Sequence, residues 1–487
     1  MKFYFSGLAA ILFLLVLNND VSGQAKINAY FNHPVNTSLA TFGINAAYLA
    51  SGTMADTIVA YINRAKYTLD IAQYDYNQDN YDGTYANIAA AVNNAYTRGV
   101  TVRWIYDGSA SNSGLSALDN GINTLPRPVN SSGDIMHNKF IIIDANSTNP
   151  TDAILCTGSE DWSSEMFYND YNNILFIQDS SLASVYTREF NMMWGSTTAV
   201  PNASLAKFGT AKTPLGVNIF SIAGHEVELY FSPSDNPDSH IASTILTANK
   251  DLYVGVYDMT RTGDANNIVA VKNSGVYTLA VVDQYTPSTS SSVNNTLSAG
   301  LGSDYVVYSG SYIYHNKMMV VDPSDTCSDP IVETGSENWT SAGTNYNDEN
   351  ILIIHNDTLA NLYYQSIISD FTTIGGGSFS HITGCGDTGT STGTNVQAVS
   401  AIEGNTAIYP NPASRQFTIS YTLSSAFSSS VVIRNVMGQI VAVLANNELQ
   451  TEGVHNYLFS IDEPGVYFVD FILGGQRFVK KILITGF

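Results

Sequence analysis

Two short segments of the sequence carry the same set of reactive side chains. They read M-H-N-K-F-I-I-I-D at residues 136–144 and Y-H-N-K-M-M-V-V-D at residues 314–322. Each holds a histidine, a lysine two positions later and an aspartate five positions after the lysine: His137, Lys139 and Asp144, then His315, Lys317 and Asp322. In an extended chain, side chains two positions apart point to one face, so each histidine and lysine can contact the same anion. One such pair alone is typical of a structural histidine, whereas two copies with matching flanks indicate a shared site.

The residues after each segment supply further polar groups. T-G-S-E-D-W follows the first segment and T-G-S-E-N-W the second, which makes Ser159 and Ser336 equivalent. A phosphodiester is an anion that repels nucleophiles, so its cleavage needs ammonium and hydroxyl donors near the nonbridging oxygens. We expect the two lysines and the two serines to bind the phosphate. A neutral imidazole can attack phosphorus while a protonated one gives its proton to the leaving alkoxide, so each segment would supply one histidine.

The elements that must position these segments are duplicated as well. Strand-like runs at 69–75 and 252–258 both end in Tyr-Asp, and apolar residues at helical spacing follow each run. Further strands are predicted at 100–106 and 276–282, each followed by an aspartate. Strand, helix and strand in succession predict a parallel pair joined by a right-handed crossover. The predicted fold class is therefore α/β, with two duplicated halves packed as one catalytic unit.

The amino terminus has the composition of an export signal. A lysine at position 2, an apolar run at 8–17 and small residues at 21–23 predict a secretory signal peptide over residues 1–23. The apolar run is short for a bilayer span, and a retained membrane anchor is the alternative. We assign residues 24–205 to the first half and 206–385 to the second.

Beyond residue 385 the composition changes. Residues 386–404 are rich in Gly, Thr and Ser and predict a flexible linker. Short alternating runs separated by turn residues follow, and they predict a small all-β sandwich over residues 405–487.

Charge and cysteine content narrow the functional classes. The chain has a formal net charge of −22, which repels polyanions and disfavours a dedicated nucleic-acid binder. Of its three cysteines, Cys156 lies in an apolar run and is expected to be a buried thiol. Cys327 and Cys385 lie in polar surroundings, where a disulfide between them is one option and two free thiols the other.

No cofactor is predicted. The remaining histidines have no repeated spacing with Cys, Asp or Glu that would indicate a zinc or iron site: His33, His225, His240, His355, His381 and His455. We therefore expect no metal and no organic cofactor.

The carboxyl-terminal segment resembles the type IX secretion sorting domain of Bacteroidetes. The matching pieces are Y-P-N-P-A at 409–413, N-V-M-G-Q at 435–439, P-G-V-Y-F-V at 464–469 and K-K-I-L-I at 480–484. This resemblance implies recognition by the secretion machinery and a secreted or cell-surface location. A carbohydrate-binding or adhesion sandwich is the alternative.

Residues 25 to about 375 resemble the phospholipase D superfamily, with its paired H-x-K-(x)4-D motifs and downstream G-S-x-N. The family implies a two-step, metal-free reaction through a phosphohistidine. Carried over, His137 would be the nucleophile and His315 the general acid, with Asp144 and Asp322 as supporting residues. The second copy matches fully, including Asn338, and Glu349 would orient His315.

The first copy departs from the family pattern at two positions. Asp161 stands where the family has an amide, and Asn172 stands at the position equivalent to Glu349. A carboxylate normally fixes the tautomer of a catalytic histidine, so its loss matters. Asp170 could substitute for it. Alternatively, the two histidines exchange roles or the reaction is slow.

Three functions remain open from the sequence. The first is a phospholipase D acting on the head group of glycerophospholipids, and the second is a secreted nuclease using the same residues. The third is a noncatalytic surface binding protein, which the intact histidines and lysines disfavour. Because both motifs lie in one chain, a monomer would hold a complete site.

Overall fold

The computed structural model describes residues 27–41, 43–50, 52–77, 84–129, 133–324, 328–377, 379, 406–423, 427–435, 440–473 and 476–485. The predicted signal peptide, the predicted linker, Cys327 and Cys385 lie outside this set, as does most of the N-V-M-G-Q turn. Cys156 is a buried free thiol, as expected.

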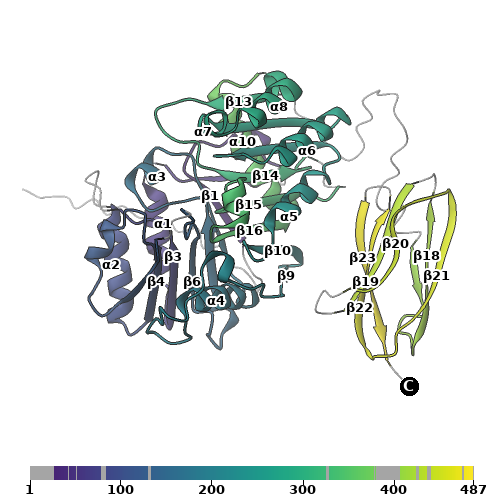
Figure 1. The fold of residues 1–487 in the computed structure, drawn as a ribbon, viewed down its shortest axis with the longest axis horizontal. Coiled ribbons are helices and arrows are strands. Elements are labelled where there is room, and N and C mark those ends of the chain that lie inside the picture. The colour runs from purple at the N-terminus through teal and green to yellow at the C-terminus, as the bar shows by residue number, and fades with distance from the viewer. Residues whose placement is uncertain are drawn as a thin grey trace, which may run out of the picture.

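In its described residues, the first half is an eight-stranded sheet with four α-helices along the chain (Figure 1). Its strands are β1 (Ile27–Phe31), β2 (Ala47–Tyr48), β3 (Thr68–Gln73), β4 (Thr101–Asp107), β5 (Asn123–Arg127), β6 (Lys139–Ile143), β7 (Ile154–Gly158) and β8 (Asn173–Ile177). The helices are α1 (Thr53–Ile62), α2 (Thr84–Thr97), α3 (Ser164–Tyr168) and α4 (Ser180–Trp194). The sheet order is β2-β1-β8-β7-β6-β3-β4-β5.

The second half repeats this plan. Its strands are β9 (Ile219–Ile222), β10 (His225–Ser232), β11 (Asp251–Val256), β12 (Tyr277–Asp283), β13 (Tyr305–Tyr308), β14 (Lys317–Val321), β15 (Ile331–Gly335) and β16 (Glu349–His355). The helices are α5 (Pro237–Ile245), α6 (Thr262–Asn273), α7 (Tyr285–Thr289), α8 (Ser291–Leu301), α9 (Ser341–Asn345) and α10 (Asp357–Ile374). Read from β9, the order β9-β10-β16-β15-β14-β11-β12-β13 matches the first sheet strand for strand.

Strand directions confirm the predicted crossovers. β3 and β4 are parallel, as are β11 and β12, and a helix connects each pair. The motif strands β6 and β14 run antiparallel to β3 and β11. The halves differ at one edge, because β2 is parallel to β1 whereas β9 is antiparallel to β10. The duplicated α/β class predicted from the sequence is thus confirmed.

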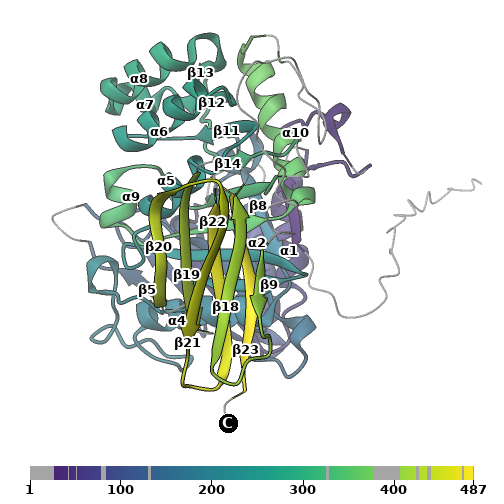
Figure 2. The same ribbon diagram turned by 90° about the vertical axis from the view of Figure 1, so that its right-hand side faces the viewer.

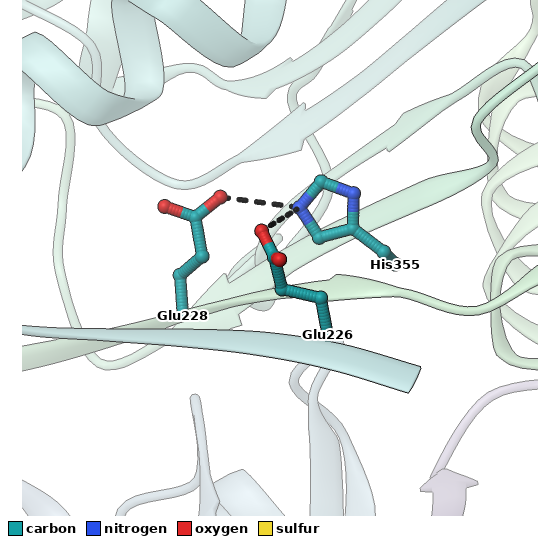
Figure 3. Close-up of side chains that lie close together, drawn as sticks. All are labelled: Glu226, Glu228 and His355. Carbon is teal, nitrogen blue, oxygen red and sulfur yellow. Dashed lines mark hydrogen bonds and ion pairs between the residues drawn. The ribbon is translucent and has the colours of Figure 1, made fainter. Parts of the chain in front are cut away.

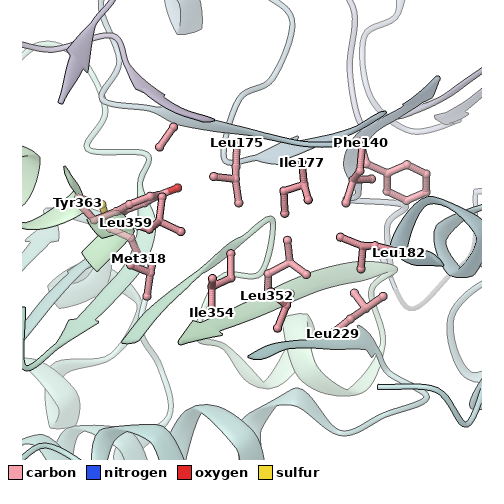
Figure 4. Packing of buried hydrophobic residues seen from close by; sticks show 14 of the residues in the cluster. Phe140, Leu175, Ile177, Leu182, Leu229, Met318, Leu352, Ile354, Leu359 and Tyr363 are labelled. Carbon is pink, nitrogen blue, oxygen red and sulfur yellow. The ribbon is translucent and has the colours of Figure 1, made fainter. Parts of the chain in front are cut away.

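One hydrophobic core joins the two halves (Figure 4). It combines residues of both sheets with residues of α4 and α10: Phe140, Leu175, Ile177, Leu182, Leu229, Met318, Leu352, Ile354, Leu359 and Tyr363. Each half also has an outer core of its own between its sheet and its remaining helices. Because Leu175 and Leu352 lie on β8 and β16, burial of apolar surface holds these strands at the junction of the halves.

The carboxyl-terminal segment is an all-β sandwich (Figure 2). Its strands are β17 (Ala407–Tyr409), β18 (Gln416–Leu423), β19 (Phe427–Asn435), β20 (Ile440–Gln450), β21 (Gly453–Ser460), β22 (Gly465–Leu473) and β23 (Gln476–Ile484). Sheets β17-β18-β21 and β20-β19-β22-β23 enclose a core of their own. None of the helices in the described residues is long and apolar enough to span a bilayer.

The aspartate of each motif ends its strand in a turn. Asp144 has a φ of 51° and Asp322 a φ of 48°, a left-handed conformation that aspartate tolerates better than most residues. The Asp144 carboxylate accepts the backbone N–H groups of Lys66, Tyr67 and Thr68 at 2.7 to 3.2 Å. Asp322 accepts those of residues 249–251 in the same way. Both carboxylates therefore fasten the motif strand to the strand beside it.

We predict that Asp144→Ala destabilises the α/β body by about 2 to 4 kcal/mol, because three N–H groups lose a charged acceptor. Asp144→Asn should cost less, since it keeps an acceptor oxygen and tolerates positive φ. Calorimetry of the full chain and hydrogen exchange at the amides of residues 66–68 measure both effects. Unchanged exchange in Asp144→Ala would contradict the assigned hydrogen bonds.

Candidate active site

Four backbone hydrogen bonds bring the two motif histidines to the junction of the halves. The N–H of His137 donates to the carbonyl of Asp348 (2.9 Å), and the N–H of Asp348 donates to the carbonyl of Ile135 (2.9 Å). The second motif is bound in the same way. There the N–H of His315 donates to Tyr171 (3.0 Å), and that of Tyr171 donates to Ile313 (2.9 Å). Each motif thus pairs with the segment that leads into β8 or β16 of the other half.

This exchange decides which residue holds each imidazole. His137 Nδ1 lies 2.9 and 2.8 Å from the two carboxylate oxygens of Glu349. His315 Nδ1 lies 3.0 Å from Oδ1 of Asn172. The expectation that Glu349 orients His315 is wrong, because Glu349, the first residue of β16, contacts the motif histidine of the opposite half. The proposed nucleophile His137 therefore has a carboxylate partner after all.

Asp170 does not substitute at either imidazole. One of its carboxylate oxygens accepts the backbone N–H of Ile313 at 2.7 Å, beside the second motif. It supports the segment before His315 instead. Asp107 and Asp283, which follow the predicted strands, have a similar position, since they accept the N–H groups of Met136 (2.7 Å) and Tyr314 (2.9 Å).

Both motif lysines are buried. Lys139 and Lys317 are 3% and 0% exposed, and their ammonium groups donate to the carbonyls of His137 (3.0 Å) and His315 (2.7 Å). Each ammonium also lies over a tyrosine ring, Tyr74 at 5.1 Å and Tyr257 at 5.2 Å, which adds a favourable cation–π contact. Burial, followed by repulsion from Lys139, lowers the pKa of Lys317 well below its usual value. An anion between the lysines would relieve that repulsion.

The serines do not face an open phosphate site. The Ser336 hydroxyl donates to Glu349 (2.7 Å) and accepts from the N–H of Asn350 (3.1 Å). The Ser159 hydroxyl donates to Asn172 (2.8 Å) in the equivalent arrangement. Because a hydroxyl has a single proton, neither serine has one left for a phosphate oxygen. In this structure the serines fix the partners of the histidines, which corrects their predicted phosphate contact.

Asparagines across the junction form a second layer that sequence reasoning missed. Asn350 donates to Asn138 (2.9 Å) and accepts from Thr157 (2.8 Å), and all three are buried. The symmetric set is Asn173, Asn316 and Thr334. The repeated asparagine of H-N-K was visible in the sequence. Its partners on the other half were not.

Hydrogen bonding fixes the tautomer of both rings. The Glu349 carboxylate and the Asn172 oxygen already accept serine hydroxyls, and both are acceptors toward the imidazoles. Nδ1 is therefore the donor in each ring, and Nε2 carries the lone pair when the ring is neutral. Burial and the neighbouring lysines lower the pKa of both His137 and His315 well below the usual value. Burial raises the pKa of Glu349 to about 7.

The first half carries a carboxylate close to this centre. Asp161 Oδ1 lies 3.1 Å from the ammonium of Lys139, and its Oδ2 lies 3.9 Å from Nε2 of His315. The equivalent residue Asn338 is neutral. The two lysines are therefore unequal, since Lys139 has an anionic partner within the site.

Two family models match parts of the chain. A family model described as "Cardiolipin synthase, PLD-like domain" matches residues 58–194 and 241–371, together more than half of the chain. A second, "Secretion system C-terminal sorting domain", matches residues 407–485.

Individual proteins match this chain with identities below 30%. The mitochondrial cardiolipin hydrolase of Drosophila melanogaster is 29% identical over 154 residues, which are 28% of this chain and 57% of that protein. A phospholipase D of Rickettsia bellii is 27% identical over 155 residues, 31% of this chain and 72% of that protein. The phosphatidylserine synthase structure from Haemophilus influenzae is 12% identical, covers 72% of this chain and 85% of its own, and has a TM-score of 0.47.

One group of side chains among the described residues has metal-ligand types in close reach (Figure 3). Potential ligand atoms of Glu226, Glu228 and His355 lie within 4.8 Å of one another. His355 ends β16, six residues after Glu349, so it lies ~20 Å from that residue along the strand. Its Nε2 is 3.1 Å from Glu228, and its Nδ1 is 2.8 Å from Asp329. Burial would lower the pKa of His355, but these carboxylates outweigh it and raise the pKa to about 10, so the ring is a cation that donates from both nitrogens.

We predict that His355→Gln destabilises the α/β body by about 1 to 2 kcal/mol at pH 6, because the ion pairs of His355 are lost. The effect is modest, since Asp329 is largely exposed and solvent screens its pair with His355. The folded pKa is above the unfolded value of 6.5, so the stabilisation is complete below pH 6.5 and is lost as the pH rises toward 10. Calorimetry of the full chain at pH 6, 8 and 10 measures the difference. His455→Gln in the sandwich is the control, and a difference that does not shrink with pH would contradict the ion pairs.

Proposed function

Because the chain belongs to the phospholipase D superfamily and ends in a type IX secretion sorting domain, we propose that it is an exported phosphodiesterase that acts through a phosphohistidine. The observation that carries this proposal is the arrangement of His137 and His315 at one junction. Each ring is fixed through Nδ1 by the opposite half, which leaves both Nε2 atoms for chemistry.

In the first step, Nε2 of His137 attacks phosphorus and forms a P–N bond. The P–O bond to the leaving group breaks, and the protonated Nε2 of His315 gives its proton to the leaving alkoxide. Glu349 accepts the Nδ1–H of His137 and stabilises the positive charge that develops on this ring. The carboxylate on His137 supports its role as the nucleophile.

In the second step, water attacks phosphorus from the side that the alcohol has left. His315, now neutral, takes a proton from that water, and the P–N bond breaks to release His137. The enzyme returns to its starting protonation state. Lys139 and Lys317 offset charge on the nonbridging oxygens in both steps, and their burial strengthens this interaction.

Substrate binding also explains how His315 becomes an acid. In the free protein, burial and then Lys317 lower the pKa of His315 well below its usual value, so the ring is neutral near pH 7. A diester anion between the lysines adds negative charge beside both rings and favours protonation. The acid would therefore be charged in the complex.

We assign the head-group diester of a glycerophospholipid as the substrate. The net charge of −22 repels polyanionic nucleic acid, and the similar proteins named above include a cardiolipin hydrolase and a phospholipase D. The catalytic unit would span residues 24–205 and 206–385 as a monomer. The sandwich at 405–487 would direct the protein to the type IX machinery and thus to the medium or the cell surface.

A substrate panel tests this assignment. We expect the purified chain without its predicted signal peptide to release choline or ethanolamine from phosphatidylcholine or phosphatidylethanolamine and to leave single-stranded DNA intact. A labelled diester should leave its label on His137 after rapid quenching. Full activity of His137→Ala on every cleaved substrate would contradict the mechanism, DNA cleavage alone would indicate a nuclease, and label on His315 would exchange the two roles.

The pH dependence tests Glu349. Its carboxylate must be ionised to stabilise the positive charge that develops on His137, and its pKa in the free protein is about 7, so kcat/KM should rise as the pH increases through 7. Glu349→Gln should lower kcat by about 100- to 10,000-fold and remove this acid limb, because the amide carries no charge at any pH. His355→Gln is a matched control on the same strand. An acid limb that persists in Glu349→Gln would show that another group controls it.

A further inference from the structure

The two halves contain the same pair of side-chain types with their positions exchanged. After the T-G-S-E segment, the first half has the carboxylate Asp161 and the second half the amide Asn338. At the start of the following strand, which is β8 in the first half and β16 in the second, the first half has the amide Asn172 and the second half the carboxylate Glu349. Each half therefore supplies one carboxylate and one amide to the site.

Both exchanged residues of the first half lie around one ring. Asn172 Oδ1 is 3.0 Å from Nδ1 of His315, and Asp161 Oδ2 is 3.9 Å from Nε2 of the same ring. His137 has its carboxylate, Glu349, at Nδ1. Each imidazole thus has one carboxylate, but on opposite ring nitrogens.

We propose that Asp161 is a positioning residue that favours a proton on Nε2 of His315 once the diester is bound, so that the side of the ring on which the carboxylate lies separates the acid from the nucleophile. This inference rests on the proposed function. A carboxylate at Nδ1 holds a proton there and leaves Nε2 with a lone pair, as nucleophilic attack requires. A carboxylate near Nε2 favours the proton at that nitrogen, as proton donation requires. The neutral amide Asn172 accepts the Nδ1–H without competing for charge.

The other charged groups around the pair are consistent with this role. His315 faces the cations Lys317 and Lys139 and the ring of His137, all of which disfavour its protonated form, whereas a hydrogen bond to the backbone of Ser159 favours it. Asp161 also faces the carboxyl groups of Asp75 and Glu160, the ammonium of Lys317 and the ring of His137, whose protonated form it favours as well. Among these carboxyl groups, Asp161 is the one whose oxygen lies within 4 Å of Nε2 of His315. Its other oxygen pairs with Lys139 at 3.1 Å.

The proton balance of the reaction is unchanged by Asp161. His315 gives its Nε2 proton to the leaving alkoxide as the P–O bond breaks, and it regains a proton from the attacking water. Asp161 exchanges no proton and bonds to no reacting atom. Its effect is on the fraction of His315 that is protonated when the diester is bound.

A double-mutant cycle tests the exchange. Asp161→Asn should lower kcat by about 10- to 100-fold without raising KM, because Lys139 loses a competing anion while His315 loses its charge partner. In that background Asn172→Glu should not restore kcat, because it returns a carboxylate to the ring at Nδ1 and not at Nε2. In the wild-type background Asn172→Glu should give no gain. Asn338 shows that the fold accepts an amide at the equivalent position.

A readout independent of turnover is the pKa of His315, followed by NMR in the full chain with labelled histidine. It should fall in Asp161→Asn and rise again in the double variant. Glu165→Gln, which neutralises an exposed carboxylate on α3, is the control and should leave it unchanged.

The outcomes separate the possible failures. Recovery of kcat in the double variant would show that the side of the ring does not matter, and it would overturn the inference. If Asp161 served only to neutralise Lys139, Asp161→Asn would change KM, while the pKa of His315 would stay constant. That result would overturn the inference. If no diester were cleaved by the wild type, the proposed function would fail, and the NMR titration would still decide whether Asp161 and His315 are coupled.

Discussion

Two ammonium groups buried at one junction are the constraint on which the rest of the site depends. Lys139 and Lys317 are almost fully removed from solvent, and burial together with repulsion from Lys139 lowers the pKa of Lys317. The central core keeps this arrangement in place, since residues of both sheets bury apolar surface against one another. Under the proposed function, the two cations would therefore already be in place before a phosphate binds.

Hydrogen bonds across the junction make the two halves dependent on each other. Neither motif contains the group that fixes its own histidine, because Glu349 and Asn172 come from the opposite sheets. The buried asparagines behind them follow the same rule. A half in isolation would leave these polar groups without partners, which is costly in a buried setting. Duplication supplied the scaffold, and the differences between the copies give the two histidines unequal surroundings.

Several features were predictable because their physics is local. Alternating and helical periodicities predicted β3, α2 and β4 and their parallel arrangement, and the repeated H-N-K segments indicated one shared site. The assignment of Glu349 to His315 was wrong because it assumed that each histidine is held by a residue of its own half. The serine hydroxyls were expected at the phosphate for a related reason. Their position behind the histidine partners depends on which face of β7 and β15 meets the next strand.

The sequence by itself determined the two motif pairs, the α/β class, the acidic balance and the sandwich at the carboxyl end. These follow from residue types and from spacings of a few positions, and such spacings set which side chains share a face. Only the tertiary structure decided that each imidazole is held by the other half and that Asp161 lies near His315. Those contacts join residues more than 140 positions apart, and they depend on how two sheets pack, which no local pattern encodes.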